Sequence, residues 1–376
     1  MRVLIAAGGT AGHVNPALAI AAGIKEQWPG AEIHFAGRRE GMECGLVSRA
    51  GYPFHYIEVH GIQRSLTPEN ISRNAKALWH LAFAPGKARE ILNEFQPNLV
   101  VGAGGYVSGP VLREAAKMGF ATAIHEQNAY PGVTNRLLAK MVDLVFAPTE
   151  TAVQRLGQSQ KTVVAGNPVR PELFLQNRKE CREKLGIEDE RIVLLSYGGS
   201  LGAMRLNQAV AELARWHIEN RNFLHVHATG SIEKADFALL AGKMGIAGNP
   251  HFIIREYIDD MPQMLAAADF VICRAGALTL AELAAVGRAS VLVPSPNVAE
   301  NHQYYNALEF ERAEAAEVLE EKNMSSNSLV EVVDTLTQNP SVLRTMGEKA
   351  KTLAHPEALK IIIESLEKLM QDKNKA

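Results

Sequence analysis

The chain has 376 residues, of which 47% are hydrophobic and 21% charged, and its formal net charge is −2. This composition is typical of a globular protein and gives no global electrostatic support for a nucleic-acid partner. Its three cysteines lack a CxxC spacing, which argues against a zinc knuckle or a disulfide framework and favours a reducing compartment. The length predicts two domains.

Short apolar runs alternate with helical patterns through the first half of the chain. We expect strands at 2–7, 31–36, 54–59, 98–102, 121–125, 143–147 and 162–165. Helical patterns lie between several of these strands, for example at 15–28, 108–118 and 133–141. Strands rich in Val, Ile and Leu that alternate with helices are typical of parallel sheets covered on both faces.

The second half repeats this alternation. We expect strands near 191–197, 223–228, 251–258, 270–274, 289–293 and 316–319. The helices expected here lie near 203–220, 232–244, 277–286, 302–313, 326–338 and 342–353. The sequence therefore predicts an α/β fold of two Rossmann-like parallel-sheet domains facing a central cleft, with ligands at the carboxyl ends of the strands.

The segment Gly166–Pro171, rich in proline and glycine, is the expected hinge. We predict one domain at 1–165 and a second at 166–355, with an amphipathic helix at 356–373 that packs back onto the first. The first apolar run is too short for a signal peptide, and no stretch approaches the ~18 apolar residues of a membrane span. We therefore expect a protein that is soluble or at most bound to a membrane surface.

A glycine-rich turn follows the first strand. Gly8–Gly12 leads to His13, and the next helix is expected to open with Asn15 as N-cap and Pro16 at the first helical position. A strand, a glycine loop and a helix N-terminus together favour anion binding. The turn is not a GxGxxG motif, and Ala36–Arg39 supplies no acidic residue for a ribose, which disfavours a dinucleotide oxidoreductase.

Polar residues follow a later strand of the first half. After a second glycine-rich turn at 102–110, the run His125–Asn128 stands at the carboxyl end of an apolar strand. We expect Glu126 and Asn128 to contact substrate. For His125 the alternative is a hydrogen-bonded network that caps the sheet.

The second half holds two further candidate anion sites. The backbone N–H groups of Gly198–Ser200 and the hydroxyl of Ser200 suit a phosphate. Arg274–Gly276 ends another strand, and the free N–H groups of the helix that follows suit a diphosphate. Glu282 suits a ribose diol or complements the helix dipole. Gln303 suits sugar hydroxyls, and a plain N-cap is the alternative for 301–303.

Seven motifs, in this order, resemble the MurG family of bacterial glycosyltransferases. They are Gly8-Gly9-Thr10-x-Gly12-His13, His125–Asn128, Gly166–Arg170, Gly198-Gly199-Ser200-x-Gly202-Ala203, Ile258–Met261, Arg274–Thr279 and His302–Ala307. The resemblance runs from residue 1 to beyond 350. It implies a GT-B fold and an inverting transfer of N-acetylglucosamine from UDP-N-acetylglucosamine to O4 of the muramoyl residue of lipid I, which gives lipid II in peptidoglycan synthesis. It implies no metal and no cofactor.

The resemblance also implies roles for individual residues. It implies that Arg170 and Ser200 contact phosphate, that Ile258 borders the uracil and that Glu282 binds the ribose. The helix N-terminus formed by Ala277, Leu278 and Thr279 would face the phosphate and the sugar, and Asn128 and Gln303 would hold the N-acetylglucosamine. Thr10, Ala11 and Gly12 would close over the donor from the first domain. One departure concerns Ala11, which stands where the family usually has glycine. Its methyl group is tolerable only at a negative φ.

Glycosyl transfer needs a base for the acceptor hydroxyl and stabilisation of the leaving diphosphate. His13 is the leading candidate for the base because imidazole titrates near neutrality, and Glu126 is its rival. The other reading of His13 is a ligand of the acceptor's diphosphate. The chain shows no DxD pair placed for Mg²⁺, and Asp259-Asp260 is expected to cap the following helix. Helix dipoles and neighbouring polar groups are then expected to stabilise the charge on the leaving diphosphate.

A lipid-linked acceptor requires a membrane-facing surface. Residues 61–91 mix aromatic, aliphatic and basic side chains, which suits an anionic interface. The residues expected there or at the acceptor are Lys76, Leu78, Trp79, Phe83, Tyr106 and Lys140. Ordinary helix packing is the alternative. We expect a peripheral protein on the cytoplasmic side of the cell membrane.

Other functions remain open on the sequence alone. A UDP-sugar:diacylglycerol transferase shares the fold and needs the same interface, but the Gly-His loop and the run at 125–128 favour the lipid I enzyme. A UDP-N-acetylglucosamine 2-epimerase shares fold and donor, and the basic aromatic segment argues against it. A scaffold that only recruits a partner would not need a complete donor site.

Overall fold

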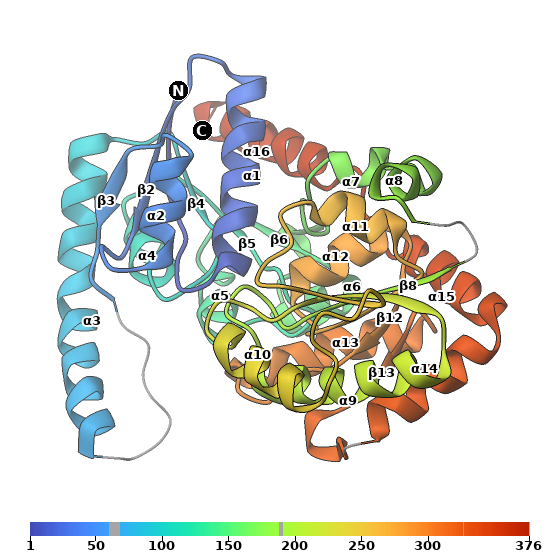
Figure 1. Cartoon of the computed structure of the whole chain (residues 1–376). Coiled ribbons are helices and arrows are strands. Elements are labelled where there is room, and N and C mark those ends of the chain that lie inside the picture. The colour runs from blue at the N-terminus through green and yellow to red at the C-terminus, as the bar shows by residue number, and fades with distance from the viewer. Residues whose placement is uncertain (60–67, 188–190, 326, 376) are drawn as a thin grey trace. The chain divides into compact units, whose positions relative to one another are not determined.

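A computed structural model describes residues 1–59, 68–187, 191–325 and 327–375 (Figure 1). The chain divides into two compact units. The first comprises Met1–Pro168 and Glu357–Ala376, and the second comprises Val169–Pro356. The first division therefore falls inside the glycine- and proline-rich segment 166–171.

The first unit is built on a seven-stranded sheet in the order β3-β2-β1-β4-β5-β6-β7, with every neighbouring pair parallel. Its strands are β1 (Arg2–Ala6), β2 (Glu32–Gly37), β3 (Phe54–Tyr56), β4 (Leu99–Gly102), β5 (Ala121–His125), β6 (Leu144–Ala147) and β7 (Thr162–Val164). Its α-helices are α1 (Ala11–Gln27), α2 (Met42–Arg49), α3 (Pro68–Phe95), α4 (Ser108–Lys117), α5 (Val133–Leu138), α6 (Glu150–Leu156) and α16 (Ala358–Lys375).

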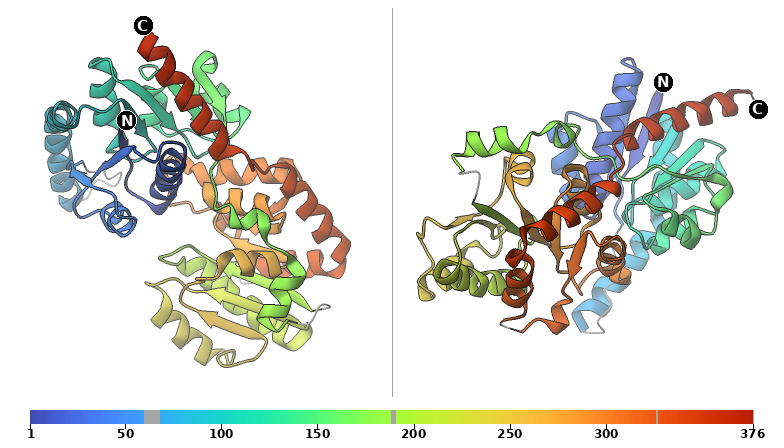
Figure 2. Two further views of the ribbon diagram at one scale, coloured as in Figure 1. Left: turned by 90° about the horizontal axis from the view of Figure 1, so that it is seen from above. Right: turned by 90° about the vertical axis from the view of Figure 1, so that its right-hand side faces the viewer.

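Both faces of this sheet are covered. Along β1, Val3 and Ile5 belong to one apolar cluster, whereas Leu4 and Ala6 belong to another. Successive strand side chains point to opposite faces, so a strand buried on both faces must be continuously apolar. The C-terminal helix α16 packs beside α1 (Figures 1 and 2), and Leu359 lies against the backbone of Gly23 on α1.

The start of α1 differs from the prediction. The helix begins at Ala11, with Thr10 as an extended N-cap, and Pro16 lies inside it rather than at its first position. A proline removes one intrahelical hydrogen bond, which the helix tolerates here because its apolar residues, such as Ile20 and Ile24, are fully buried. Ala11 is helical and has no positive φ, so its methyl group is accommodated.

The second unit holds a six-stranded parallel sheet in the order β10-β9-β8-β11-β12-β13. Its strands are β8 (Ile192–Tyr197), β9 (Phe223–Ala228), β10 (Phe252–Arg255), β11 (Phe270–Cys273), β12 (Ala289–Leu292) and β13 (Ala316–Val318). Its α-helices are α7 (Glu172–Leu175), α8 (Arg178–Leu185), α9 (Met204–Asn220), α10 (Lys234–Lys243), α11 (Met261–Ala267), α12 (Ala277–Val286), α13 (His302–Arg312), α14 (Ser328–Gln338) and α15 (Pro340–Thr352).

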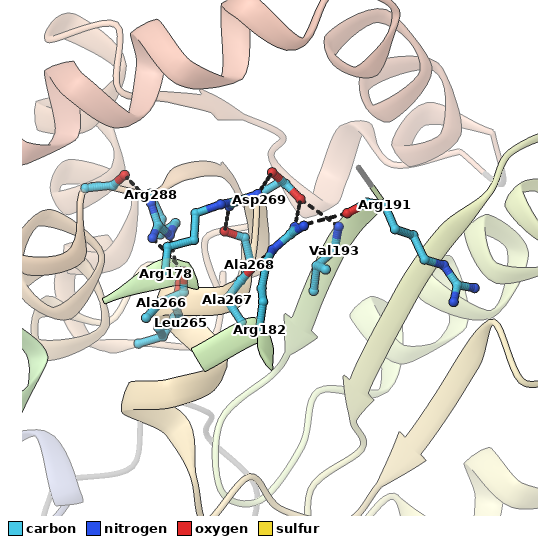
Figure 3. Close-up of polar contacts among 11 residues, drawn as sticks. Arg178, Arg182, Arg191, Val193, Leu265, Ala266, Ala267, Ala268, Asp269 and Arg288 are labelled. Carbon is cyan, nitrogen blue, oxygen red and sulfur yellow. Dashed lines mark hydrogen bonds and ion pairs between the residues drawn. The ribbon is translucent and has the colours of Figure 1, made fainter. Parts of the chain in front are cut away.

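An arginine cluster joins α8 to α11 and the sheet (Figure 3). The carboxylate of Asp269 accepts hydrogen bonds from Arg178 at 2.6 Å, from Arg182 at 2.7 Å and from the backbone N–H of Val193 at 2.7 Å. Arg182 is only 1% exposed and also donates to the carbonyl of Ala267. A buried guanidinium needs such partners because desolvation is costly, so this cluster is structural.

The strand order of each sheet defines one switch point. In the first unit the order reverses between β1 and β4, and in the second between β8 and β11. Open α/β sheets bind ligands at the carboxyl ends of the two strands that flank such a point. The three anion sites predicted from the sequence follow β1, β8 and β11, and the glycine-rich turn at 102–110 follows β4. Among the helices that the structure describes, none is long and apolar enough to cross a bilayer.

Candidate active site

His13 lies in the first turn of α1, at the carboxyl end of β1. Its Nδ1 is 3.0 Å from the carbonyl oxygen of Gly8 and 3.3 Å from the hydroxyl of Thr10. A carbonyl can only accept a hydrogen bond, so Nδ1 carries the proton and Nε2 of the neutral ring holds the lone pair. Burial lowers the pKa of His13, while the bond to Gly8 and the charge of Glu43 oppose that shift. The ring is therefore neutral at pH 7 and can accept a proton at Nε2.

The turn after β4 holds the His13 ring in place. A Cβ on Gly104 would lie 2.5 Å from Cδ2 and 3.0 Å from Nε2 of His13, and Gly104 has a φ of +97°. Only glycine allows both this φ and this approach. The buried hydroxyl of Ser108 lies 2.8 Å from the carbonyl oxygen of Gly104 and 2.9 Å from that of Ala6, which ties the turn to the end of β1.

A buried carboxylate supports the same loop from α2. Glu43 is 1% exposed. It accepts hydrogen bonds from the backbone N–H of Gly9 at 3.3 Å and of Arg38 at 3.1 Å. Sequence reasoning missed this residue because a single glutamate near the start of a helix usually faces solvent. The glycines around it, including Gly8 and Gly37, were the available signal: a Cβ on either would lie 2.8 Å from the Glu43 side chain.

Glu126 is buried and organises the loop after β5. Its Oε1 accepts from the backbone N–H of Gln127 at 2.9 Å, and from the backbone N–H and the side-chain amide of Asn128 at 2.8 and 3.1 Å. Its Oε2 accepts from Gly132 N–H at 3.1 Å and from the amide of Asn135 at 2.8 Å. With both oxygens engaged in this way, the carboxylate orients Asn128 rather than standing open as a base.

His125 and Gln127 cap the sheet beneath that loop. His125 is fully buried, with Nε2 3.1 Å from the carbonyl oxygen of Gly166 and Nδ1 2.9 Å from the Gln127 amide. Burial lowers the pKa of His125 to about 4. The amide of Asn167 donates to the carbonyl of Gln127 at 2.9 Å. His125 is therefore a structural residue, the alternative considered from the sequence.

The glycine loop after β8 lies on one side of the switch point of the second unit. Gly199 and Gly202 have φ of +99° and +94°. The carbonyl of Ser200 accepts from Ser231 N–H at 3.1 Å, which joins the loop to the turn after β9. Ser200 itself is exposed, so its hydroxyl can reach a ligand.

The N-terminus of α12, which follows β11, lies on the other side of this switch point. Gly276 is an extended N-cap without a side-chain cap. The first N–H groups of a helix lack intrahelical partners, so those of Ala277, Leu278 and Thr279 are available to an anion at the positive end of the dipole. The amide of Asn306 donates to the carbonyl of Ala275 at 3.2 Å and links this turn to α13.

Arg170 and Glu282 form an ion pair beside α12. Arg170 Nη2 is 3.4 Å from Glu282 Oε1. Burial raises the pKa of Glu282, and Arg170 opposes the shift. Glu282 lies beyond the first turn of α12. Its alternative role, to complement the helix dipole, is therefore not supported. Gln303 on α13 accepts from the backbone N–H of Ser295 at 2.9 Å, and Ile258 is buried.

The structure therefore groups the predicted residues into two sets. Thr10, Ala11, Gly12, His13, Glu126 and Asn128 belong to the first unit, and Arg170, Ser200, Ile258, Ala277, Leu278, Thr279, Glu282 and Gln303 to the second. Asp260 is the N-cap residue of α11 but makes no side-chain cap, contrary to expectation, because its carboxylate accepts from Arg255 at 2.8 Å. Within the described parts of the chain, no cluster of three acidic, histidine or cysteine residues is placed to hold a metal.

The residues expected at a membrane are only partly described. Phe83 and Tyr106 are 61% and 53% exposed, and Lys140 is exposed. Phe83 lies on α3, and Tyr106 in the turn after β4. The side chains of Lys76, Leu78 and Trp79 lie outside the described residues.

Two parallel-sheet units, each with a glycine loop at its switch point, define the GT-B class of fold. The model of the glycosyltransferase family 28 N-terminal domain matches residues 3–147, and that of the C-terminal domain matches residues 193–362. The chain belongs to glycosyltransferase family 28.

Full-length relatives narrow the comparison. A protein of Acetivibrio thermocellus named UDP-N-acetylglucosamine--N-acetylmuramyl-(pentapeptide) pyrophosphoryl-undecaprenol N-acetylglucosamine transferase is 40% identical over 99% of both chains. One of the same name from Caldanaerobacter subterraneus is 42% identical over 95% of this chain and 97% of its own. The crystal structure of Acinetobacter baumannii MurG matches with a TM-score of 0.77 at 28% identity, covering 98% of this chain and 99% of that one. The UDP-GlcNAc 2-epimerase of Neisseria meningitidis shares the fold, with a TM-score of 0.65 at 16% identity over 98% of this chain and 100% of that chain.

Proposed function

We propose that the chain transfers N-acetylglucosamine from UDP-N-acetylglucosamine to O4 of the muramoyl residue of lipid I, giving lipid II and UDP. The observation that carries this proposal is its 40% identity, over 99% of both chains, to a transferase named for that donor and that acceptor. The epimerase alternative is supported by fold alone, at 16% identity.

The second unit binds the donor in this proposal. The free N–H groups at the start of α12 and the exposed Ser200 hydroxyl receive the diphosphate, and Arg170 adds positive charge. Glu282 accepts hydrogen bonds from the ribose hydroxyls, and Ile258 borders the uracil. Preorganised dipoles stabilise the charge that develops on leaving UDP, so the reaction needs no metal.

The first unit supplies the base. Nε2 of neutral His13 takes the proton from the muramoyl O4 hydroxyl as that oxygen attacks C1 of the sugar. The bond from C1 to the β-phosphate oxygen breaks, UDP leaves with the bonding electrons, and the configuration at C1 inverts. Glu126, whose oxygens hold five N–H donors, positions Asn128 for the N-acetylglucosamine.

The lipid acceptor requires contact with the membrane. Phe83, Tyr106 and Lys140 are exposed on the first unit, and aromatic groups beside cations suit an anionic bilayer surface. Lys76, Leu78 and Trp79 remain predictions from the sequence for this contact. The protein is then peripheral, on the cytoplasmic side of the cell membrane.

The test measures UDP release from UDP-N-acetylglucosamine with and without a short-chain lipid I analogue. We expect release only with the analogue, together with a new β1,4-linked disaccharide. His13→Ala should lower kcat by about 10²- to 10⁴-fold and leave UDP binding unchanged. Acceptor-independent UDP release with a 2-epimerised sugar would overturn the proposal, and so would donor binding without any transfer to the analogue.

A further inference from the structure

Glu43 and His13 contact opposite ends of one peptide group. The Gly8–Gly9 peptide offers its carbonyl oxygen to Nδ1 of His13 at 3.0 Å and its N–H to Oε2 of Glu43 at 3.3 Å. Both hydrogen bonds run in the same sense, from the imidazole N–H through the peptide to the carboxylate. Hydrogen bonds in such a chain polarise one another, so an anion at one end strengthens the bond at the other.

The Glu43 carboxylate is buried at a site whose surroundings suit a negative charge. Glu43 is 1% exposed and lies in the first turn of α2, where the helix dipole favours negative charge. Its two oxygens accept from two backbone N–H groups, Gly9 and Arg38. Two N–H donors match the acceptor oxygens of a carboxylate, whereas the NH2 group of an amide in the same place would face one of these donors.

The surrounding glycines let the three groups approach. A Cβ on Gly8 would lie 2.8 Å from Oε1 of Glu43, and Gly9 has a φ of +91°. On the other side, the backbone of Gly104 and Gly105 packs against the His13 ring and Gly8. The peptide thus has a fixed orientation between carboxylate and imidazole, as preorganisation of a catalytic base requires.

We infer that Glu43 is a positioning residue for His13, acting through the Gly8–Gly9 peptide to fix the Nδ1–H tautomer and to raise the basicity of Nε2. The arrangement resembles the carboxylate–histidine pair of hydrolases, with one peptide group inserted. The inference rests on the proposed role of His13 as the base. Thr10, which contributes a neutral hydroxyl, and Gly104, which contributes backbone, also lie beside the ring.

The charged groups near the ring fix the expected direction of change. Glu43 on α2 raises the pKa of His13 against the larger effect of burial. Arg38, which follows β2, contacts Glu43 through its backbone N–H. Replacing Glu43 by a neutral residue removes the favourable charge, so the pKa of His13 must fall.

The experiment titrates His13 by NMR in the full chain carrying ¹³C-labelled histidine, with the resonance assigned by His13→Gln. Glu43→Gln should lower the pKa of His13 by about half a unit or more, and Glu43→Asp, which keeps the charge, by less. The matched control is Glu114→Gln, which removes another buried carboxylate of the same unit, paired with Arg89 and Lys117. That control should leave the pKa of His13 unchanged.

A second readout needs no variant. In the wild type, protonation of His13 at Nε2 keeps the Nδ1–H bond to the Gly8 carbonyl and strengthens it because the donor becomes charged, so the amide resonance of Gly9 should titrate with the same midpoint as the ring. If Glu43→Gln folds poorly, this measurement still decides. The inference is overturned if the chemical shift of the Gly9 amide does not change as His13 titrates, or if the pKa of His13 is unchanged in Glu43→Gln.

Activity then separates this inference from the proposed function. In Glu43→Gln the acidic limb of the kcat/KM–pH profile should move to lower pH together with the His13 pKa, and kcat should fall about tenfold, with UDP affinity unchanged. If the wild type forms no disaccharide from lipid I, the proposed function fails while the coupling measured by NMR stands. If disaccharide forms but the limb does not move, the positioning role of Glu43 fails.

Discussion

Nη2 of Arg170 lies 3.4 Å from Oε1 of Glu282, and this pair links the segment that opens the second unit to the helix whose N-terminus faces the proposed diphosphate site. Arg170 is expected to contact the phosphate and Glu282 the ribose. Each residue therefore changes the electrostatic environment of the other as well as that of the ligand.

Glu282→Ala should weaken UDP binding about ten- to a hundredfold, because hydrogen bonds to a charged group contribute about 1.5–3 kcal/mol. Isothermal titration calorimetry measures the affinity, and turnover at saturating donor measures kcat. The effect on kcat should be smaller than that on affinity. Unchanged UDP affinity would remove the ribose assignment.

Arg170→Met should shift the pH at which UDP affinity is lost. Burial raises the pKa of Glu282 and Arg170 opposes this, so without the guanidinium the pKa rises further. If ionised Glu282 holds the ribose, binding is present above its pKa and lost as pH falls through it. The midpoint of that loss should thus move to higher pH in the variant. A midpoint that stays fixed, whatever the absolute affinity, contradicts the pairing.

Gly104→Ala should lower kcat sharply, because the new Cβ would lie 2.5 Å from the His13 ring. Gly119→Ala is the matched control. Gly119 also has a positive φ, +82°, but nothing lies within 4 Å of its Cβ position. Both variants carry the backbone strain of alanine at positive φ, roughly 1 kcal/mol, and only the first should lose activity. Equal activities would show that the turn does not position His13.

A buried histidine chain should make the second unit sensitive to acid. His217 Nε2 is 3.1 Å from His225 Nδ1, and Ser196 Oγ lies 2.7 Å from His225 Nε2 and 2.8 Å from His227 Nδ1. Burial lowers the pKa of His217 to about 4 and of His227 to about 3. Because these values lie below those of the unfolded chain, the stability is complete above about pH 6.5 and is lost as pH falls toward 4.

Urea unfolding between pH 4 and 6.5 tests this expectation. His217→Leu removes one titrating group, so its free energy of unfolding should depend less steeply on pH, by up to about 1.4 kcal/mol per pH unit. The comparison uses slopes, so a change in absolute stability does not affect it. Identical slopes for variant and wild type would exclude His217 as a source of acid sensitivity.

Asp269→Ala should destabilise the protein by about 3–5 kcal/mol, because Arg182 would be left buried without its carboxylate. Asp260→Ala is the control. Asp260 pairs with Arg255 at a half-exposed position, where an ion pair contributes about 0–1 kcal/mol. Chemical denaturation measures both. A loss of under 1 kcal/mol in Asp269→Ala would mean that the arginine cluster does not hold α8 in place.

The strands were predictable because their signal is local. Each expected strand is present with ends shifted by a few residues, since a buried parallel strand must be apolar on both faces. The beginning of α1 was not predicted, because the Asn15-Pro16 signal is strong in isolation, whereas the backbone N–H groups of His13 and Val14 donate to the carbonyl of Thr10 and the helix begins at Ala11. Short helices such as α2 and α7, which lack a long apolar period, were also missed.

The sequence by itself determined the alternation of strands and helices, the glycine turns that follow particular strands and the ordered motifs that indicate the family. These depend on residue type and spacing along the chain. Only the tertiary structure decided that Glu43 is buried behind the first glycine loop, that Glu126 is occupied by five donors and that Arg170 meets Glu282. Burial and charge environment depend on residues up to 112 positions apart, and the spacing of residues in a sequence carries no record of which distant groups will share a low-dielectric site.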